Sequence, residues 1–247
     1  MTPDPSDSPN QKIPLVLLPG LMCDRTVWEH QIEHLAGIAE PFPMEWDRSH
    51  TSITRMAEAA LDAAPGKFAV AGHSMGGRAA FELYRLAPER VLRFAVLNTG
   101  VPALAQGEKG AQEEAGRRRL LAIARQQGVR AMAKEWLKGM IPPYRQDDTE
   151  LVEAIIRMFE RKTADDFEIQ MLALLGRPDA GPVLPTITCP ALVLTGADDQ
   201  WSTPATHQAI AAAMPDANLV LIPKSAHMST MERPEEVTQA MRAWITR

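Results

Sequence analysis

Several features of specialised proteins are scarce or missing in this sequence. Its 247 residues include only two cysteines, Cys23 and Cys189, too few for a disulfide framework or a thiolate metal cage. Lys and Arg number 26 against 31 Asp and Glu, and this net charge of −5 gives no basic surface for nucleic acid or anionic membranes. No stretch approaches the roughly 20 apolar residues that span a bilayer. We therefore expect reduced thiols, no nucleic-acid partner and no membrane partner.

What is present is typical of a globular protein. Hydrophobic residues make up 45% of the chain and charged residues 23%, which predicts a compact fold. The length corresponds to about 1.6 domains, so one large domain or a core with an inserted subdomain is expected. Residues 1–12 are predicted to be a polar leader, and they lack the basic and apolar regions of a signal peptide. The expected location is cytoplasmic.

Apolar runs and helical patterns alternate in two parts of the chain, residues 13–100 and 186–247. The predicted strands are Ile13–Leu18, Phe42–Trp46, Lys67–Ala71, Val91–Leu97, Ala191–Leu194 and Asn218–Ile222. Helical patterns lie between and after them, among them Trp28–Leu35, Ser52–Ala63, Ala205–Ala213 and Pro234–Ile245. This alternation predicts an α/β core with a mostly parallel sheet and helices on both faces.

The pattern changes over residues 101–185, where no convincing strand is found. Four helical patterns occupy this stretch of about 85 residues; they are Glu113–Gln127, Val129–Met140, Thr149–Lys162 and Asp165–Leu175. We expect a helical cap, or lid, inserted into the α/β core.

The segment Gly72-His73-Ser74-Met75-Gly76 lies between a predicted strand and a predicted helix and matches the nucleophile elbow, Gly-x-Ser-x-Gly. Ser74 would occupy a strained turn, and a glycine two residues to either side would leave room for the adjacent strand and helix. Amides at the start of that helix would stabilise the oxyanion formed by attack on a carbonyl. The alternative is a glycine-rich turn that carries a serine by chance; the surrounding pattern favours Ser74 as a nucleophile.

A serine nucleophile needs a histidine base and a carboxylate that orients it. His227 follows the last predicted strand, at the sheet edge expected for Ser74, whereas His73 is poorly placed beside the nucleophile. The other four histidines are expected on the solvated surface: His30, His34, His50 and His207. Asp198 and Asp199 leave a strand through a glycine turn; spacing favours Asp199 as the acid, with Asp198 capping the turn as the alternative.

Four segments together resemble the α/β-hydrolase superfamily: Leu17-Leu18-Pro19-Gly20-Leu21, Gly72-His73-Ser74-Met75-Gly76-Gly77, Gly196-Ala197-Asp198-Asp199 and Ser225-Ala226-His227. The resemblance implies that Asp199 is the acid and that the backbone amides of Leu21 and Met75 form the oxyanion hole. Pro19 stands where many members have histidine. The resemblance also implies a sheet of about six strands that lacks the family's initial antiparallel pair.

Within the superfamily the sequence is similar to small cap-bearing esterases, enol-lactone hydrolases and the menaquinone-pathway synthase. Arg78 matches an arginine that this synthase places beside its substrate carboxylate; pairing with a core carboxylate or extension to solvent is the alternative. Trp201 is a candidate for substrate binding or for buried packing. The run Arg117-Arg118-Arg119 is expected to be surface, paired with Glu113 and Glu114.

The sequence therefore predicts a serine hydrolase that cleaves a carboxylic ester or lactone, a small-molecule substrate, through an acyl-enzyme. No metal and no organic cofactor is expected. Two alternatives remain: the same triad used for proton abstraction or carbon–carbon cleavage, and a non-catalytic binding protein. Substrate identity and oligomeric state are left open by the sequence.

Overall fold

A computed structural model describes residues 12–247, so the predicted polar leader, except Lys12, lies outside the described residues. Six parallel strands form one sheet in the order β2-β1-β3-β4-β5-β6. The strands are β1 (Ile13–Leu18), β2 (Ala39–Pro43), β3 (Phe68–His73), β4 (Val91–Leu97), β5 (Ala191–Gly196) and β6 (Ala217–Ile222). The α/β fold with about six strands is confirmed.

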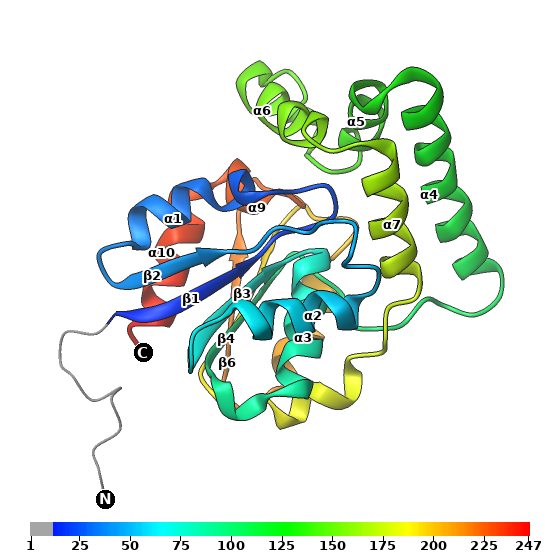
Figure 1. Cartoon of the computed structure of the whole chain (residues 1–247). Helices are drawn as coiled ribbons and strands as arrows, with labels where there is room; N and C mark the ends of the chain where they lie inside the picture. The colour runs from blue at the N-terminus through cyan, green and yellow to red at the C-terminus, as the bar shows by residue number, and fades with distance from the viewer. Residues whose placement is uncertain (1–11) are drawn as a thin grey trace, which may run out of the picture.

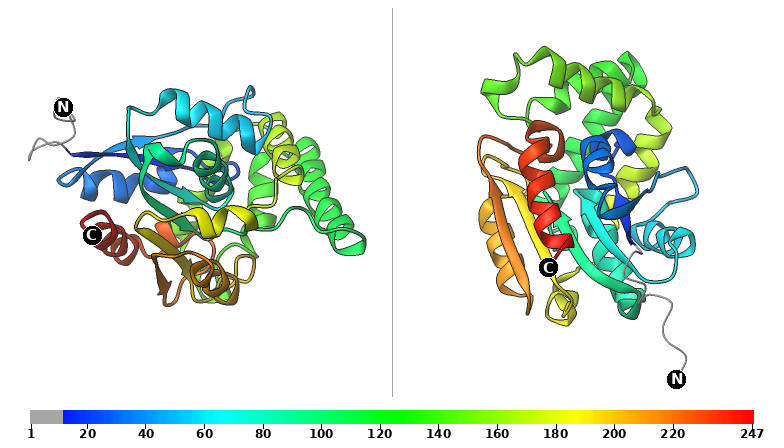
Figure 2. Two further views of the ribbon diagram at one scale, coloured as in Figure 1. Left: turned by 90° about the horizontal axis from the view of Figure 1, so that it is seen from below. Right: turned by 90° about the vertical axis from the view of Figure 1, so that its left-hand side faces the viewer.

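Helices cover both faces of the sheet, as Figures 1 and 2 show. On one face α1 (Glu29–Leu35) packs beside α10 (Pro234–Ile245). On the other lie α2 (Ile53–Ala63), α3 (Met75–Leu86) and α8 (Pro204–Ala212). Because both faces are covered, the central strands are mostly apolar, and every residue of β3 and β5 is buried.

The edge strand β2 departs from the sequence prediction. It comprises Ala39–Pro43, so the predicted strand Phe42–Trp46 was wrong by three residues. Proline has no backbone N–H to donate. It is tolerated on an edge strand because no neighbouring strand on the outer side needs that hydrogen bond. Trp46, beyond the strand, is buried and donates a hydrogen bond to the carbonyl of Pro19 at the end of β1.

Between β4 and β5 the chain forms four helices that lie over the carboxyl edge of the sheet (Figure 1). They are α4 (Glu108–Gln127), α5 (Val129–Leu137), α6 (Thr149–Glu160) and α7 (Ala164–Leu175), and we call this group the cap. Trp136 packs against Phe159 and Phe167 in its interior, with ring centroids 5.4 and 5.7 Å apart. The cap therefore has an apolar interior of its own above the sheet.

No helix within residues 12–247 has both the length and the hydropathy needed to cross a bilayer. The cytoplasmic location expected from the sequence stays a prediction.

Candidate active site

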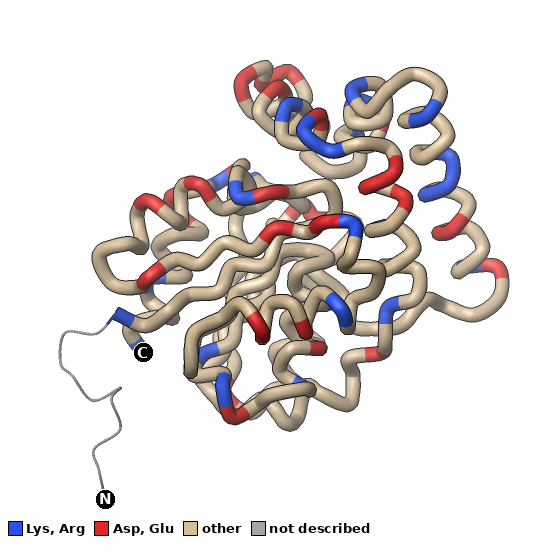
Figure 3. The backbone as a smooth tube through the Cα atoms, in the orientation of Figure 1, with Lys and Arg blue, Asp and Glu red and all other residues tan. Residues whose placement is uncertain are grey.

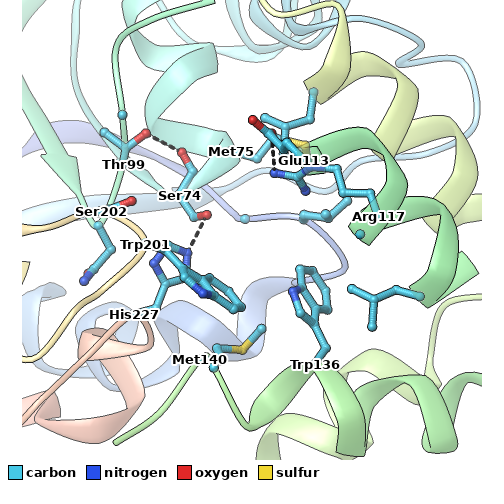
Figure 4. A pocket seen from close by; sticks show the side chains of 18 of the residues that line it. Ser74, Met75, Thr99, Glu113, Arg117, Trp136, Met140, Trp201, Ser202 and His227 are labelled. Atoms are coloured by element: carbon cyan, nitrogen blue, oxygen red, sulfur yellow. Dashed lines mark hydrogen bonds and ion pairs between the residues drawn. The ribbon is translucent and has the colours of Figure 1, made fainter. Parts of the chain in front are cut away.

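Three side chains that follow three different strands meet at the carboxyl edge of the sheet. Ser74 follows β3, Asp199 follows β5 and His227 follows β6. Ser74 Oγ lies 2.8 Å from His227 Nε2 (Figure 4), and His227 Nδ1 lies 3.0 Å from Asp199 Oδ2. An ionised carboxylate only accepts, so Nδ1 carries the proton and Nε2 accepts from the serine hydroxyl. The structure thus brings the three predicted catalytic residues into one hydrogen-bonded chain.

The turn at Ser74 explains the glycines around it. Ser74 has φ 54° and ψ −115°, a conformation that L-residues rarely adopt. A Cβ on Gly72 would overlap the carbonyl of Gly76, and a Cβ on Gly76 would overlap the carbonyl of Leu18. Ser74 N donates to Leu97 O at 2.8 Å, which ties the turn to β4. The strained turn therefore depends on close backbone packing that glycine alone permits.

Asp199 is 2% exposed, and four donors lie within 3.0 Å of its carboxylate oxygens. Oδ1 accepts from the amides of Trp201 and Ser202 at 2.9 Å, and Oδ2 accepts from His227 and from Asn98 Nδ2 at 3.0 Å. Burial alone would raise the pKa of Asp199, but His227 and these other donors hold it well below its usual range. Asp199 is therefore an ionised partner for the imidazole.

The neighbouring Asp198 has a different environment. It is exposed, and its Oδ2 accepts from the hydroxyl of Tyr144 in the cap at 2.5 Å. Of the two aspartates that the sequence left open, only Asp199 contacts His227.

The two backbone amides expected to bind an oxyanion lie beside Ser74. Met75 is the first residue of α3, so its amide has no partner within the helix. The loop after β1 lies close to the serine, because a Cβ on Gly20 would be 3.3 Å from the Cβ of Ser74, and Leu21 follows Gly20 in that loop. Within residues 12–247 neither the Leu21 nor the Met75 amide donates to a protein group. Both are available to an incoming oxygen.

The loop that carries Leu21 is fixed from two sides. Trp46 Nε1 donates to Pro19 O at 2.9 Å, and Met22 N donates to Gln170 Oε1 of α7 at 2.8 Å. Pro19 therefore contributes to the position of this loop through its carbonyl.

A cavity of about 830 Å³ opens beside Ser74 between the sheet edge and the cap. Trp136 and Met140 of the cap line it, together with Trp201 (Figure 4). The Trp201 ring lies 5.0 Å from the His227 ring and 6.2 Å from that of Trp136, and the residue is 45% exposed. Trp201 is thus part of the cavity wall and is not buried packing.

Four arginines and two glutamates line this cavity, and three of the arginines, Arg78, Arg117 and Arg177, lie around Glu113. Arg177 donates to both carboxylate oxygens of Glu113 at 2.8 Å, and Arg117 donates to one of them at 3.0 Å. Arg78 donates to Pro102 O at 2.9 Å and has no ion pair within the described part of the chain. Burial and the nearby Arg177 lower the pKa of Arg78 to about 9, so it stays charged at neutral pH. Arg117 and Arg177 thus share Glu113, and Arg78 has no carboxylate partner within residues 12–247.

The basic run of α4 is more than surface. Arg117 and Arg118 pair with Glu113 and Glu114 as expected, at 3.0 and 2.6 Å. However, Arg117 and Arg119 also line the cavity, so the prediction of a purely surface run was wrong. Figure 3 shows charges of both signs over the cap helices, as local pairing requires. The sequence could show the pairing within α4 but not the direction in which α4 faces.

His207, expected on the solvated surface, is fully buried, so that prediction was wrong. Its Nε2 accepts from the amide of Thr99 at 3.2 Å and its Nδ1 donates to Thr203 O at 3.1 Å. The hydroxyl of Thr99 donates to Ser74 O at 2.6 Å. Burial lowers the pKa of His207, and this neutral side chain supports the turn at Ser74 through Thr99.

His73 is also a neutral buried histidine. Burial and the adjacent His227 lower the pKa of His73 to about 3, and His73 Nε2 donates to His227 O at 2.8 Å. As expected from its position, His73 does not replace His227 as a base. Cys23 is buried as well, which raises its thiol pKa and leaves it unreactive.

The chain belongs to the alpha/beta hydrolase family, whose model matches residues 15–240. Among curated relatives, 3-oxoadipate enol-lactonase 2 of Acinetobacter baylyi is 29% identical over 177 residues, 71% of this chain and 62% of the relative. The (E)-2-((N-methylformamido)methylene)succinate hydrolase of the same organism is 42% identical over 59 residues, 24% of this chain and 22% of the relative. The chain thus aligns with less than two thirds of either relative.

Solved structures match over nearly the whole chain. A thermophilic esterase from Thermogutta terrifontis, with malate bound, has 27% identity and a TM-score of 0.82, covering 96% of this chain and 90% of its own. The enol-lactonase from Burkholderia xenovorans has 21% identity and a TM-score of 0.79, covering 96% and 93%, and shows the shared fold. The expected superfamily is confirmed.

Proposed function

We propose that the protein is a serine hydrolase that cleaves a carboxylic ester or lactone through an acyl-enzyme. The observation that carries this proposal is the hydrogen-bonded chain from Ser74 through His227 to Asp199, with distances of 2.8 and 3.0 Å. An unactivated serine is a poor nucleophile at neutral pH, and this arrangement supplies both the base and the group that orients it.

The proposed reaction has two halves. Ser74 attacks the carbonyl carbon and passes its proton to His227 Nε2, while Asp199 stabilises the imidazolium. The amides of Leu21 and Met75 stabilise the tetrahedral oxyanion, and His227 protonates the leaving alkoxide. A water molecule, deprotonated by His227, then attacks the acyl-enzyme carbonyl. His227 returns this proton to Ser74 Oγ as the bond to the acyl group breaks, which releases the carboxylic acid.

The charged wall of the cavity supports a substrate that carries a carboxylate. Arg78 lies one helical turn beyond Ser74 on α3, about 6 Å along the helix axis, and has no carboxylate partner among the described residues. Arg117 shares its only carboxylate, Glu113, with Arg177. A substrate carboxylate at Arg78 would offset part of this excess positive charge. The relatives fit this proposal, since succinate, oxoadipate and malate are dicarboxylates.

The arginines also favour a second candidate. With a carboxylate at Arg78, His227 could remove a proton from the substrate directly, and carbon–carbon cleavage could follow without an acyl-enzyme. The two candidates differ in whether Ser74 becomes acylated, which intact mass spectrometry after rapid mixing with an ester would detect.

The proposal is tested by intact mass after incubation with a fluorophosphonate, since this probe reacts with activated serines and needs no knowledge of the substrate. One adduct on the wild type and none on Ser74→Ala is expected. Turnover of 4-nitrophenyl butyrate by Ser74→Ala should fall by roughly 10³-fold or more, with the circular dichroism spectrum unchanged. A Ser74→Ala protein that retains most of the turnover would overturn the proposal.

A further inference from the structure

The loop that carries His227 has all its backbone groups hydrogen bonded from Ala226 to Met228. The amides of Ala226 and Met228 both donate to Glu232 Oε1 at 3.0 Å, and His227 N donates to Met140 O at 3.0 Å. The carbonyls accept from Asn98 Nδ2 (2.9 Å), His73 Nε2 (2.8 Å) and the amides of Met231 and Glu232 (2.8 Å each). Complete pairing of this kind fixes the path of a loop.

One atom, Glu232 Oε1, thus holds the two amides that flank His227. Glu232 belongs to the four-residue helix α9 (Ser229–Glu232) and is 3% exposed. Its other oxygen, Oε2, is buried and has no hydrogen-bond partner among the described residues. Burying a carboxylate in this way costs free energy, and a neutral side chain would avoid that cost. The cost suggests a specific task for this group.

The surroundings of Glu232 place it close to the chemistry. Burial raises the pKa of Glu232 to about 7, although the two amides, Arg145 and His227 oppose the rise. Arg145 from the cap, Tyr144 beside it and His227 itself are the titratable groups that face it. Arg145 Nη1 also donates to the backbone carbonyl of Glu232 at 2.5 Å, which attaches α9 to the cap.

We propose that Glu232 is a positioning residue for His227: through the amides of Ala226 and Met228 it fixes the orientation of the imidazole between Ser74 and Asp199. This inference rests on the proposed function, in which His227 is the general base. Glu232 touches no reacting atom. A small misplacement of a base costs rate without weakening substrate binding, because the geometry of proton transfer is lost while the cavity is unchanged.

Glu232 is also the member of this network that can be tested most cleanly. Asn98 contacts Asp199 directly, His73 is adjacent to Ser74, and Met140 contributes a backbone carbonyl that substitution does not remove. Glu232 can be replaced without altering any residue of the hydrogen-bonded chain.

The experiment compares Glu232→Ala, Glu232→Gln and Glu232→Asp with Glu82→Ala as a matched control. Glu82 is a buried glutamate on α3 that accepts from Thr54 at 2.7 Å and Arg85 at 2.8 Å and does not contact the His227 loop. Three quantities are measured: kcat and KM for 4-nitrophenyl butyrate, the rate of fluorophosphonate labelling, and the proton NMR resonance of His227 Nδ1–H, assigned by its loss in His227→Ala.

Glu232→Ala is expected to lower kcat and the labelling rate about ten- to a hundredfold, with KM changed less than about threefold. Its Nδ1–H resonance should shift or broaden. Glu232→Gln keeps an oxygen that can accept both amides, so it should restore most of kcat. Glu82→Ala should lose thermal stability but keep the wild-type kcat and resonance, because Glu82 is not connected to His227.

Wild-type kcat and an unchanged Nδ1–H resonance in Glu232→Ala would overturn the proposal. An equal loss of kcat in Glu82→Ala would also overturn it, because the loss in Glu232→Ala would then be explained by reduced stability alone. If Glu232→Ala does not fold, Glu232→Asp, one methylene shorter with the charge retained, decides by the same criteria. If the wild type turns over no ester and takes no label, the proposed function fails, while the resonance still shows whether Glu232 orients His227.

Discussion

The sheet edge and the cap contribute to the site in different ways. At the sheet edge each residue of the Ser74–His227–Asp199 chain lies in a turn or loop that follows a strand, and its backbone amide is hydrogen bonded. In the cap the charged side chains that line the cavity are held by ion pairs, such as Arg177 with Glu113. From this difference we expect the sheet edge to carry the proposed chemistry and the cap to select the substrate.

The two regions meet in the segment between α5 and α6. Met140 O accepts from the amide of His227, the Tyr144 hydroxyl donates to Asp198, and Arg145 donates to the carbonyl of Glu232. The cap is therefore attached to the loop that carries Asp199 and to the segment that carries His227 and Glu232. The strongest test of the difference between the two regions is to compare two neighbouring residues, one bonded to His227 and the other bonded to the cap.

Asp199→Asn should produce the largest loss. An amide at this position cannot accept from Nδ1–H and remain bonded to the Trp201 and Ser202 amides in the same way, so the imidazole adopts the wrong tautomer. We expect kcat for 4-nitrophenyl butyrate to fall roughly 10³- to 10⁴-fold. Asp198→Asn, one residue away but bonded to Tyr144, is the control and should stay within about fivefold of the wild type. Similar losses in both variants would refute the assignment of the acid.

Arg78→Met should change substrate preference more than chemistry. Two esters with four-carbon acyl groups are compared. The acyl group of 4-nitrophenyl hydrogen succinate ends in a carboxylate, and that of 4-nitrophenyl butyrate ends in a methyl group. A hydrogen bond to a charged group contributes about 1.5–3 kcal/mol, so the ratio of kcat/KM for succinyl over butyryl ester should fall about ten- to a hundredfold. Arg118→Gln is the control, because Arg118 pairs with Glu114 outside the cavity. An unchanged ratio in Arg78→Met would show that the anion does not bind there.

The sheet edge was predictable because its signals are local. The glycine pattern around Ser74 exists since no side chain fits there, and the parallel strands deliver Ser74, Asp199 and His227 to one edge whatever the details of packing. Strand Val91–Leu97 and helix Pro234–Ile245 lie where the sequence placed them. The edge strand β2 was misplaced because its prolines weaken the strand pattern.

The supporting residues were not predictable in the same way. His207 looked like a surface residue because its helix pattern is short, and only the packing of α8 under the loop after β4 shows it to be buried. Asn98 donates to the carbonyl of Ala226, which lies far away in sequence, and no local pattern reveals this contact. Glu232 accepts from amides only four and six residues before it, but these contacts depend on how the loop folds back onto α9. Arg117 faces the cavity, and this could not be predicted without knowing how the cap packs on the sheet.

The smallest expected effect concerns stability and pH. Because burial raises the pKa of Glu232 from 4.5 to about 7, the folded state keeps this proton when the unfolded state has lost it. Its contribution to stability is fully present below pH 4.5 and is lost as the pH rises through 7. Glu232→Gln cannot titrate, so relative to this variant the wild type should lose about 1–3 kcal/mol of unfolding free energy from pH 5 to pH 8.

Urea unfolding of both proteins at several pH values measures this difference. Glu82→Gln is the control, since Arg85 holds the pKa of Glu82 below its usual value and its contribution is lost only as the pH falls through that range. Between pH 5 and pH 8 the Glu82→Gln curve should therefore run parallel to that of the wild type. If the Glu232→Gln curve is parallel as well, the carboxylate that holds the His227 loop is already ionised at pH 5. The charge of Glu232 would then be balanced by its neighbours, as the charges of the cap are. In that case α9 would have to be grouped with the cap, and the sheet edge would end before it.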